Sequence, residues 1–302
     1  MRFLIDENDE NIRLDAYLAK LIDGVSRSKI QNEIKNGNVL VNGEVKKASY
    51  KLQEGDSIEF KPQIMEEVHL QPQNIPLDII YEDRNMLVVN KPSGMLTHPT
   101  TIERENTLVN ALLFKYGENL SDINGEFRRG ILHRLDRNTS GLLMVAKNNA
   151  THEFLANQIK EKTAIRRYLA VVKGPVKEDS GVIELPIGRH PTQPHKMAVV
   201  DGGKPSITEY KVLERFKNAT FVELTLKTGR THQIRVHMSH LKTPVFNDTL
   251  YGAKIEKVKT EEQVLQAYKL EFTKPNSDEI IKLEIQPDEK LQKVLKYLRS
   301  QK

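Results

Sequence analysis

Residues 131–144 read ILHRLDRNTSGLLM and place one carboxylate, Asp136, in a short polar segment between two apolar runs. Arg134 and Arg137 flank this acid, and Gly141 leads into the second run. A strand that only has to turn does not need two cations around one acid. The local pattern leaves two interpretations open. One is an Asx-type turn, in which the Asp136 carboxylate accepts backbone amides, and the other is a carboxylate held for chemistry.

The whole chain has the composition of a folded protein in water. Its 302 residues, 38% hydrophobic and 29% charged, suffice for one large or two ordinary domains. No apolar run approaches the ~18 residues of a membrane span, and the start, MRFLIDENDE, is acidic where a signal peptide is basic and then apolar. The lack of cysteine excludes disulfides and thiolate-bound metals. We expect a cytoplasmic monomer that does not contact membranes.

Basic residues are clustered, although the net charge of +5 is modest. Residues 20–51 hold seven basic side chains against three acidic ones, and residues 227–242 hold four against none. Such clusters are typical of a polyanion partner, but a solvated basic face has the same composition. Charge alone leaves both interpretations open.

Residues 1–62 predict a small unit of two helices, a hairpin and a closing strand. The stretch KPQIMEEVHLQPQNIP, with three prolines and no clear periodicity, predicts a linker over residues 63–75. The signals in the first unit are helical spacing in 11–22, an N-cap at Ser26, a helix-ending Gly37, the hairpin dipeptide Asn42-Gly43 with short β-type runs on both sides, and a turn at Gly55-Asp56.

Residues 76–302 contain mostly short β-rich segments bounded by Gly, Pro, Asn or Asp. Helices are expected over 148–162, after an asparagine cap, and over 231–241. This pattern predicts an α+β domain built around an extended, largely antiparallel sheet. The order of its strands does not follow from the sequence.

The first unit resembles the S4 RNA-binding fold, through LDAYLAKL and then SRSKIQNEIKNGNVLVNGEVKKASYKLQEGDSIEF. The resemblance implies that Arg27, Lys29, Lys46 and Lys47 face RNA. Arg27 and Lys29 open a helix whose first amides favour phosphate, which supports this expectation. The alternative is a helix–hairpin domain with ordinary surface lysines.

The second unit is similar to the pseudouridine synthases of the family typified by synthase A of ribosomal large-subunit RNA and tRNA. HRLDRNTSGLLMVAKN matches its catalytic motif, and the S4-like unit in front makes the chain look most like the ribosomal synthase D and C types. The family implies an isomerase of uridines in large-subunit ribosomal RNA. A tRNA substrate and a non-catalytic RNA-binding or ribosome-assembly factor are the alternatives. Further matches are YEDRNMLVVNKPSGMLTHP at 81–99, RRYLAVVKG at 166–174, GKPSITEYKVLERF at 203–216 and TGRTHQIRVHMSHL at 228–241.

The reaction that the resemblance implies requires a carboxylate that stays ionised beside anionic RNA. Uracil is detached at N1 and rejoined through C5, with no group added and no electron transferred, so we expect no cofactor and no metal. The family assigns the nucleophile to Asp136 and implies that Arg230 forms the ion pair that keeps it charged. It makes Tyr168 the active-site tyrosine, although a core aromatic is the alternative, and gives Arg134 the extrusion of the target nucleotide. Arg235 is expected to contact RNA.

Three histidines, His232, His237 and His240, suggest a metal site, but their spacing does not support one. On a helix the first two imidazoles would lie about 140° apart, and no acid accompanies them in 227–242. We therefore expect RNA-facing or packing histidines. The turn around Lys91, Pro92 and Gly94 has either a structural or a direct role.

Two segments depart from the family pattern. KTPVFNDTLYG at 242–252 has Asn247 where the family has glycine, but retains Asp248, Tyr251 and Gly252. LQA at 265–267 stands where the family has LHA. Both departures lie outside the expected carboxylate–arginine pair, so they put the local loop shape and the substrate in question.

Overall fold

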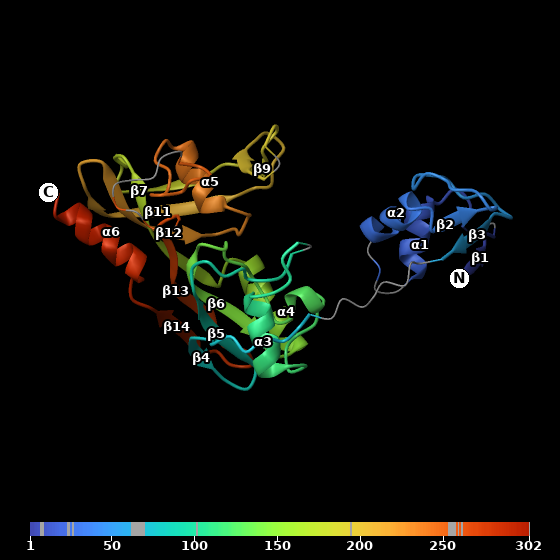
Figure 1. Ribbon diagram of the computed structural model, residues 1–302, viewed down its shortest axis with the longest axis horizontal. Helices are drawn as coiled ribbons and strands as arrows, with labels where there is room; N and C mark the ends of the chain where they lie inside the picture. Colours follow the sequence, from blue (N-terminus) through green and yellow to red (C-terminus); the bar gives the residue numbers. More distant parts are fainter. Residues whose placement is uncertain are drawn as a thin grey trace. The chain divides into compact units, whose positions relative to one another are not determined.

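The computed structural model describes residues 1–6, 9–22, 25, 27–61, 70–100, 102–193, 195–252, 258, 260 and 262–301. The chain divides into two compact units, residues 1–69 and 70–302 (Figure 1). The cap predicted at Ser26 and residues 63–69 of the predicted linker lie outside the described residues. Residues 70–75 belong to the second unit, where Leu70 is buried and its amide donates to Glu126 at 2.9 Å.

The first unit packs two helices against a three-stranded antiparallel sheet of order β1-β3-β2. Apolar residues one turn apart, such as Leu14 with Leu18 and Ile30 with Ile34, are buried in its core, as their spacing predicts. Gly37 has a φ of 79°, the left-handed conformation expected after the second helix. The elements are α1 (Leu14–Leu21), α2 (Arg27–Lys35), β1 (Arg2–Leu4), β2 (Val39–Val41) and β3 (Ser57–Phe60).

The hairpin in this unit is only partly as predicted. Asn42 and Gly43 have φ values of 53° and 81°, and Val41 and Glu44 exchange backbone hydrogen bonds of 2.8 and 3.0 Å, so the tight turn is confirmed. The expected return strand is wrong, because in the short run Glu44-Val45 that follows the turn only Glu44 forms a bridge, with Val41. The strand β2 pairs with β3 instead, and β1, which the sequence did not predict, covers the other edge of β3.

The described part of the second unit contains a nine-stranded sheet of order β4-β5-β6-β13-β7-β12-β11-β8, in which β14 also pairs with β13. The β6–β13 pair is parallel and the other pairs are antiparallel, which confirms the α+β expectation. A separate two-stranded sheet joins β9 and β10. The strands are β4 (Ile79–Glu82), β5 (Met86–Lys91), β6 (Ser140–Ala146), β7 (Ile165–Lys173), β8 (Ser180–Glu184), β9 (Ile187–Arg189), β10 (Met197–Val199), β11 (Ile207–Arg215), β12 (Ala219–Leu226), β13 (Leu265–Thr273) and β14 (Ile280–Glu284).

Helices cover both faces of this sheet. Leu143 on β6 shares a core with α3 and α5, whereas the next residue, Met144, packs on the other face with α4. The last helix, α6, packs through Leu291 against Val171 of β7. Asn148 caps α4 by accepting the Thr151 amide at 2.9 Å, as the sequence predicts. The helices are α3 (Leu108–Tyr116), α4 (Asn149–Lys160), α5 (Gln233–His240) and α6 (Glu289–Arg299), with a short 3-10 turn at Glu126–Arg128.

Gly141 marks the place where the loop of Asp136 enters the sheet. It has a φ of 117° and lies against the backbone of β13, where a Cβ atom would come within 2.0 Å of the Ala267 carbonyl oxygen. Only glycine fits such a close approach. The glycine that follows the polar segment is therefore required by the parallel crossing of β6 and β13.

Candidate active site

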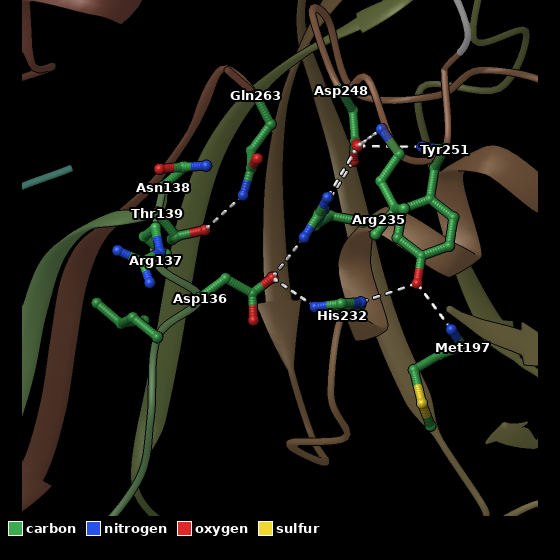
Figure 2. Close-up of polar contacts among 12 residues, drawn as sticks. Asp136, Arg137, Asn138, Thr139, Met197, His232, Arg235, Asp248, Tyr251 and Gln263 are labelled. Carbon is green, nitrogen blue, oxygen red and sulfur yellow. Dashed lines mark hydrogen bonds and ion pairs between the residues drawn. The ribbon is translucent and has the colours of Figure 1, made fainter. Parts of the chain in front are cut away.

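Asp136 lies in the loop before β6, and its carboxylate points toward Arg235 of α5 (Figure 2). Arg235 Nη1 donates to Asp136 Oδ2 at 3.1 Å. The turn is closed by the backbone, because the Thr139 amide donates to the Asp136 carbonyl at 3.1 Å. Among the described residues no amide of the loop donates to the carboxylate, so the Asx-turn interpretation is wrong. The acid instead borders a cleft in the surface of the second unit.

The expected partner of Asp136, Arg230, is not the one that the structure provides. Arg230 is exposed, and its Nε donates to the carbonyl of Pro205 at 3.2 Å. Arg235, which was expected to contact RNA, lies between two acids, with its Nε and Nη2 on Asp248 at 2.7 and 2.9 Å. Its side chain is only 8% exposed. Arg235 thus makes the ion pair with Asp136 that we expected from Arg230.

The two acids around Arg235 favour the charged form of its guanidinium. Burial lowers the pKa of the Arg235 guanidinium, but hydrogen bonds and charges from Asp248 and Asp136 outweigh burial, so this pKa is raised. The Asp248 side chain is fully buried and also accepts the amides of Leu250 and Tyr251, both at 3.1 Å. Asp248 therefore positions Arg235, which in turn presents one guanidinium nitrogen to Asp136.

Asn247 explains why the departure from the family glycine is tolerated. Its φ is 57°, in the left-handed region that glycine adopts readily and asparagine tolerates better than most residues. Its side-chain amide donates to the Val258 carbonyl at 2.9 Å and to the Thr260 hydroxyl at 2.8 Å. The substitution keeps the backbone that leads into Asp248.

His232 lies beside the same carboxylate oxygen that Arg235 binds (Figure 2). Its Nε2 lies 3.9 Å from Asp136 Oδ2, and its Nδ1 lies 2.8 Å from the hydroxyl of Tyr251, which accepts the amide of Met197 at 2.9 Å. The phenol that accepts this amide still has its own proton to donate to Nδ1, and in that arrangement the neutral imidazole carries its proton on Nε2, toward Asp136. Burial lowers the pKa of His232, which favours this neutral form.

The other two histidines, His237 and His240, make no contact with Asp136 in the described structure. His237 is buried and bonded to the Thr208 hydroxyl at 2.9 Å and to the Leu185 carbonyl at 3.1 Å, so it is a packing histidine. His240 ends α5. In the described ranges, no group of three or more His, Asp or Glu side chains is placed to hold a metal ion.

Tyr168 and Arg134 line the cleft next to Asp136. The cleft holds a cavity of about 530 Å³ that all three residues border. Tyr168, on β7, is 4% exposed and belongs to the core, as the core-aromatic alternative expects, and it also borders this cavity. Burial raises the pKa of its phenol, which is therefore neutral at pH 7. Arg134 is exposed, and within the described chain no acid pairs with it.

The cavity is strongly basic. Of the described residues that line it, six carry a permanent positive charge and one is a carboxylate, Asp136. A cavity of this composition attracts anions and holds its single acid under a positive potential. The six are Arg134, Lys160, Lys162, Arg166, Lys227 and Arg230.

In the first unit, the four expected RNA contacts differ in what they touch. Arg27 donates to the buried carboxylate of Asp15 at 2.9 Å, and its side chain is half exposed. Lys46 pairs with Glu44 at 2.6 Å. Lys29 and Lys47 are exposed. Arg27 and Lys46 thus have acidic partners inside the unit, which weakens their positive field toward an RNA.

Comparison with known proteins shows which family the sequence matches. A family model described as RNA pseudouridylate synthase matches residues 85–240, which include Asp136, Tyr168 and Arg235, and a model of the S4 domain matches residues 12–58. The chain belongs to the RNA pseudouridylate synthase family. The protein is therefore an isomerase that carries an S4 domain in front of its pseudouridine synthase domain, as the sequence predicted.

Relatives of this pseudouridine synthase match nearly its whole length. The uncharacterized RNA pseudouridine synthase YlyB of Bacillus subtilis is 42% identical over 97% of this chain and 96% of its own. The ribosomal large subunit pseudouridine synthase D of Xanthomonas campestris is 40% identical over 95% of this chain and 89% of its own. The solved structure of human RNA pseudouridylate synthase domain containing 1 is 27% identical, covers 76% of this chain and 96% of its own, and has a TM-score of 0.57.

Among the described residues of the synthase, no helix is both long and apolar enough to cross a bilayer. The cytoplasmic location and the monomeric state that the sequence suggests stay predictions, as does the absence of a cofactor and a metal.

Proposed function

We propose that this pseudouridine synthase isomerises uridines in large-subunit ribosomal RNA, and that Asp136 is the nucleophile, acting on a uridine turned out of the RNA. The observation that carries the proposal is the Asp136 carboxylate, bound by the buried Arg235 and facing a basic cavity. A carboxylate beside phosphates stays ionised only where a nearby cation compensates them, and Arg235 is such a cation.

The chemistry requires few groups. The N1–C1′ bond breaks, a C5–C1′ bond forms, C5 loses its proton and N1 gains one, so no electron is transferred. The Asp136 carboxylate adds to the base or to the sugar carbon and leaves again, which divides one difficult step into easier ones. Tyr168, as a neutral phenol at the same cavity, suits stacking on the uracil and the transfer of the C5 proton.

Access to the uridine requires its extrusion, because neither C5 nor the glycosidic bond is reachable in a stacked helix. A cavity of about 530 Å³ beside Asp136 is large enough for a base and part of its ribose. Arg134 fills the position that the nucleotide leaves in the RNA, a role that its exposure at this cavity supports.

The ribosomal substrate is supported by relatives named ribosomal large subunit pseudouridine synthase D and by the S4 domain. Mapping pseudouridines in ribosomal RNA and tRNA from cells with and without this protein tests it. We expect positions in large-subunit RNA to be lost and restored by the purified enzyme. Loss in tRNA alone would contradict the substrate, and no loss in either RNA would favour a non-catalytic RNA-binding factor.

A further inference from the structure

Arg166 is a buried guanidinium for which the described protein provides no counter-charge. Its residue is 5% exposed, and its Nε has neither solvent nor a hydrogen-bond partner. No carboxylate of the described residues lies within ion-pair distance of it, although it borders the same cavity as Asp136 and Tyr168. Burying a charge without a partner is costly, so this arrangement requires a compensating function.

The groups around Arg166 do not provide that compensation. Burial and the charge of Arg166 itself lower the pKa of His133 to about 3, so this histidine is neutral at pH 7. Tyr168 is a neutral phenol. The backbone also closes over the guanidinium, since a Cβ atom on Gly229 would lie 3.0 Å from Arg166 Nη1. The side chain is thus held in place at the cavity wall without an anion.

The neighbouring arginine on the same strand shows the contrast. Arg167 is 29% exposed and pairs with Glu271 at 3.3 Å. Successive residues of a strand point to opposite faces, so Arg167 points away from the cavity, and Arg166 and Tyr168 share a face. One of two adjacent arginines on β7 is neutralised by the protein and the other is not.

We propose that Arg166 binds the phosphodiester group next to the target uridine, so that the RNA supplies the missing anion. The inference rests on the proposed function and deepens it by assigning a phosphate subsite. Two residues along a strand span about 7 Å, so a nucleotide whose base meets Tyr168 brings its own linkage within reach of Arg166. A guanidinium binds phosphate oxygens with charge-assisted, often paired, hydrogen bonds.

The stability arm of the test compares Arg166→Met with the matched control Arg167→Met in thermal unfolding without RNA or phosphate. Arg166→Met should raise Tm or leave it unchanged, because it removes an unpaired buried charge and keeps the apolar volume. Arg167→Met should lower Tm, because it leaves Glu271 unpaired. A fall in Tm for Arg166→Met as large as that of the control would overturn the proposal.

The binding arm uses the pentanucleotide AAUAA, whose single uridine defines the register. Its Kd is measured with natural linkages and with an uncharged methylphosphonate placed 5′ or 3′ of the uridine. For the wild-type enzyme one of the two neutral linkages should weaken binding about 10- to 100-fold. Arg166→Met should bind the natural oligonucleotide as weakly as the wild type binds the neutral one, and the neutral linkage should not weaken its binding further. Arg167→Met should have the Kd values of the wild type for all three oligonucleotides.

If the wild type binds all three oligonucleotides equally, or if Arg166→Met responds to the neutral linkage as the wild type does, Arg166 does not contact a phosphate. Failure of the proposed function would look different. A protein that shows this linkage effect but converts no uridine would retain the subsite and would not be the isomerase of the RNA proposed above.

Discussion

At the scale of single residues, the site depends on one arginine shared by two acids. Arg235 uses two nitrogens on the fully buried Asp248 and a third on Asp136, which remains 17% exposed at the cavity. The more buried carboxylate fixes the guanidinium, so the less buried one meets a cation that is already positioned. Asp136 thus has a cation at hydrogen-bond distance and remains accessible from the cavity, the two features that the proposed nucleophile needs.

We predict that Arg235→Met lowers the free energy of unfolding by about 3 kcal/mol, because Asp248 is left charged and buried without its partner. The matched control is Arg230→Met, five residues away, whose guanidinium is exposed and bonded to a carbonyl. The control should change stability by less than about 0.5 kcal/mol. Urea unfolding measures both, and equal losses would contradict the assignment of Arg235 as the buried partner.

Acid stability depends on His133. Burial, and then the charge of Arg166, lower its pKa to about 3 in the folded protein, against ~6.5 in the unfolded chain. Between these values the unfolded state binds more protons, so the stability that neutral His133 contributes is complete above pH 6.5 and is lost as the pH falls toward 3. His133 is partly accessible, which moderates the effect.

We therefore expect the free energy of unfolding of the wild type to fall by an extra amount on the order of 2 kcal/mol between pH 6.5 and pH 4, relative to His133→Gln. Glutamine keeps an acceptor for the Met144 amide, which His133 Nε2 accepts at 3.1 Å. Urea unfolding at several pH values measures the difference. Parallel pH profiles for the two proteins would show that His133 does not titrate in this way.

At the scale of elements, the loop of Asp136 is held by segments that lie far away in the sequence. Lys91 of β5 donates to the Arg137 carbonyl at 3.0 Å, Lys290 of α6 donates to the Asn138 carbonyl at 2.9 Å, and the Ser140 hydroxyl donates to Asp288 at 2.5 Å. Lys91 is fully buried and also donates to the carbonyls of Pro92 and Met95, both at 2.8 Å, which favours the structural role for this turn.

The parallel crossing of β6 and β13 should be the least tolerant part of the sheet. Gly141→Ala would place a Cβ atom 2.0 Å from the Ala267 carbonyl oxygen, and we predict a loss of about 3 kcal/mol or more. Gly174→Ala is the control, since Gly174 also has a positive φ, 74°, but nothing within 4 Å. It should lose about 1 kcal/mol. Similar losses in urea unfolding would mean that backbone strain, and not the crossing, dominates at Gly141.

Local signals predicted much of the secondary structure, and non-local packing limited the rest. The cap at Asn148 and the turn at Asn42-Gly43 depend on neighbouring residues and are confirmed. Helix α3 was missed because LVNALLFKY is a nearly continuous apolar run. Helix α6 was missed although Leu291, Val294, Leu295 and Leu298 have helical spacing, so that signal was present in the sequence.

The partner of Asp136 could be predicted only as an arginine of TGRTHQIR. Arg230 and Arg235 both occur there, and the choice depends on where α5 begins and on Asp248, which arrives from the next segment. His232, in a left-handed conformation, turns the chain into α5. The segment at 242–252 keeps the family residues Asp248 and Tyr251. These two residues were the available signal for the second acid on Arg235 and for the hydroxyl that contacts His232.

At the scale of the whole molecule, we expect the two units to divide the tasks of RNA recognition and chemistry. The S4 domain should supply contacts to RNA phosphates, and the synthase domain holds the basic cavity. Of the four expected contacts, Lys47 is exposed, whereas Arg27 and Lys46 already bind acids.

We predict that Lys47→Gln weakens binding of ribosomal RNA and reduces the slope of log Kd against log salt by about 0.7–0.9, the contribution of one phosphate contact. The matched control is Lys274→Gln in the synthase domain, where the lysine pairs with Glu279 at 3.5 Å. Gel shifts over a range of salt concentrations measure the slopes. An unchanged slope in Lys47→Gln would show that Lys47 does not contact an RNA phosphate.

The most direct test of the central claim is tritium release from large-subunit ribosomal RNA that carries 5-tritiated uridine. With EDTA present, the wild type and the control Asp201→Asn, an exposed acid of the same unit, should release label as C5 loses its hydrogen. Asp136→Asn should bind the RNA with an unchanged Kd and release none. Release by Asp136→Asn at the wild-type rate would contradict the account, because the reaction would then not depend on the carboxylate that Arg235 binds.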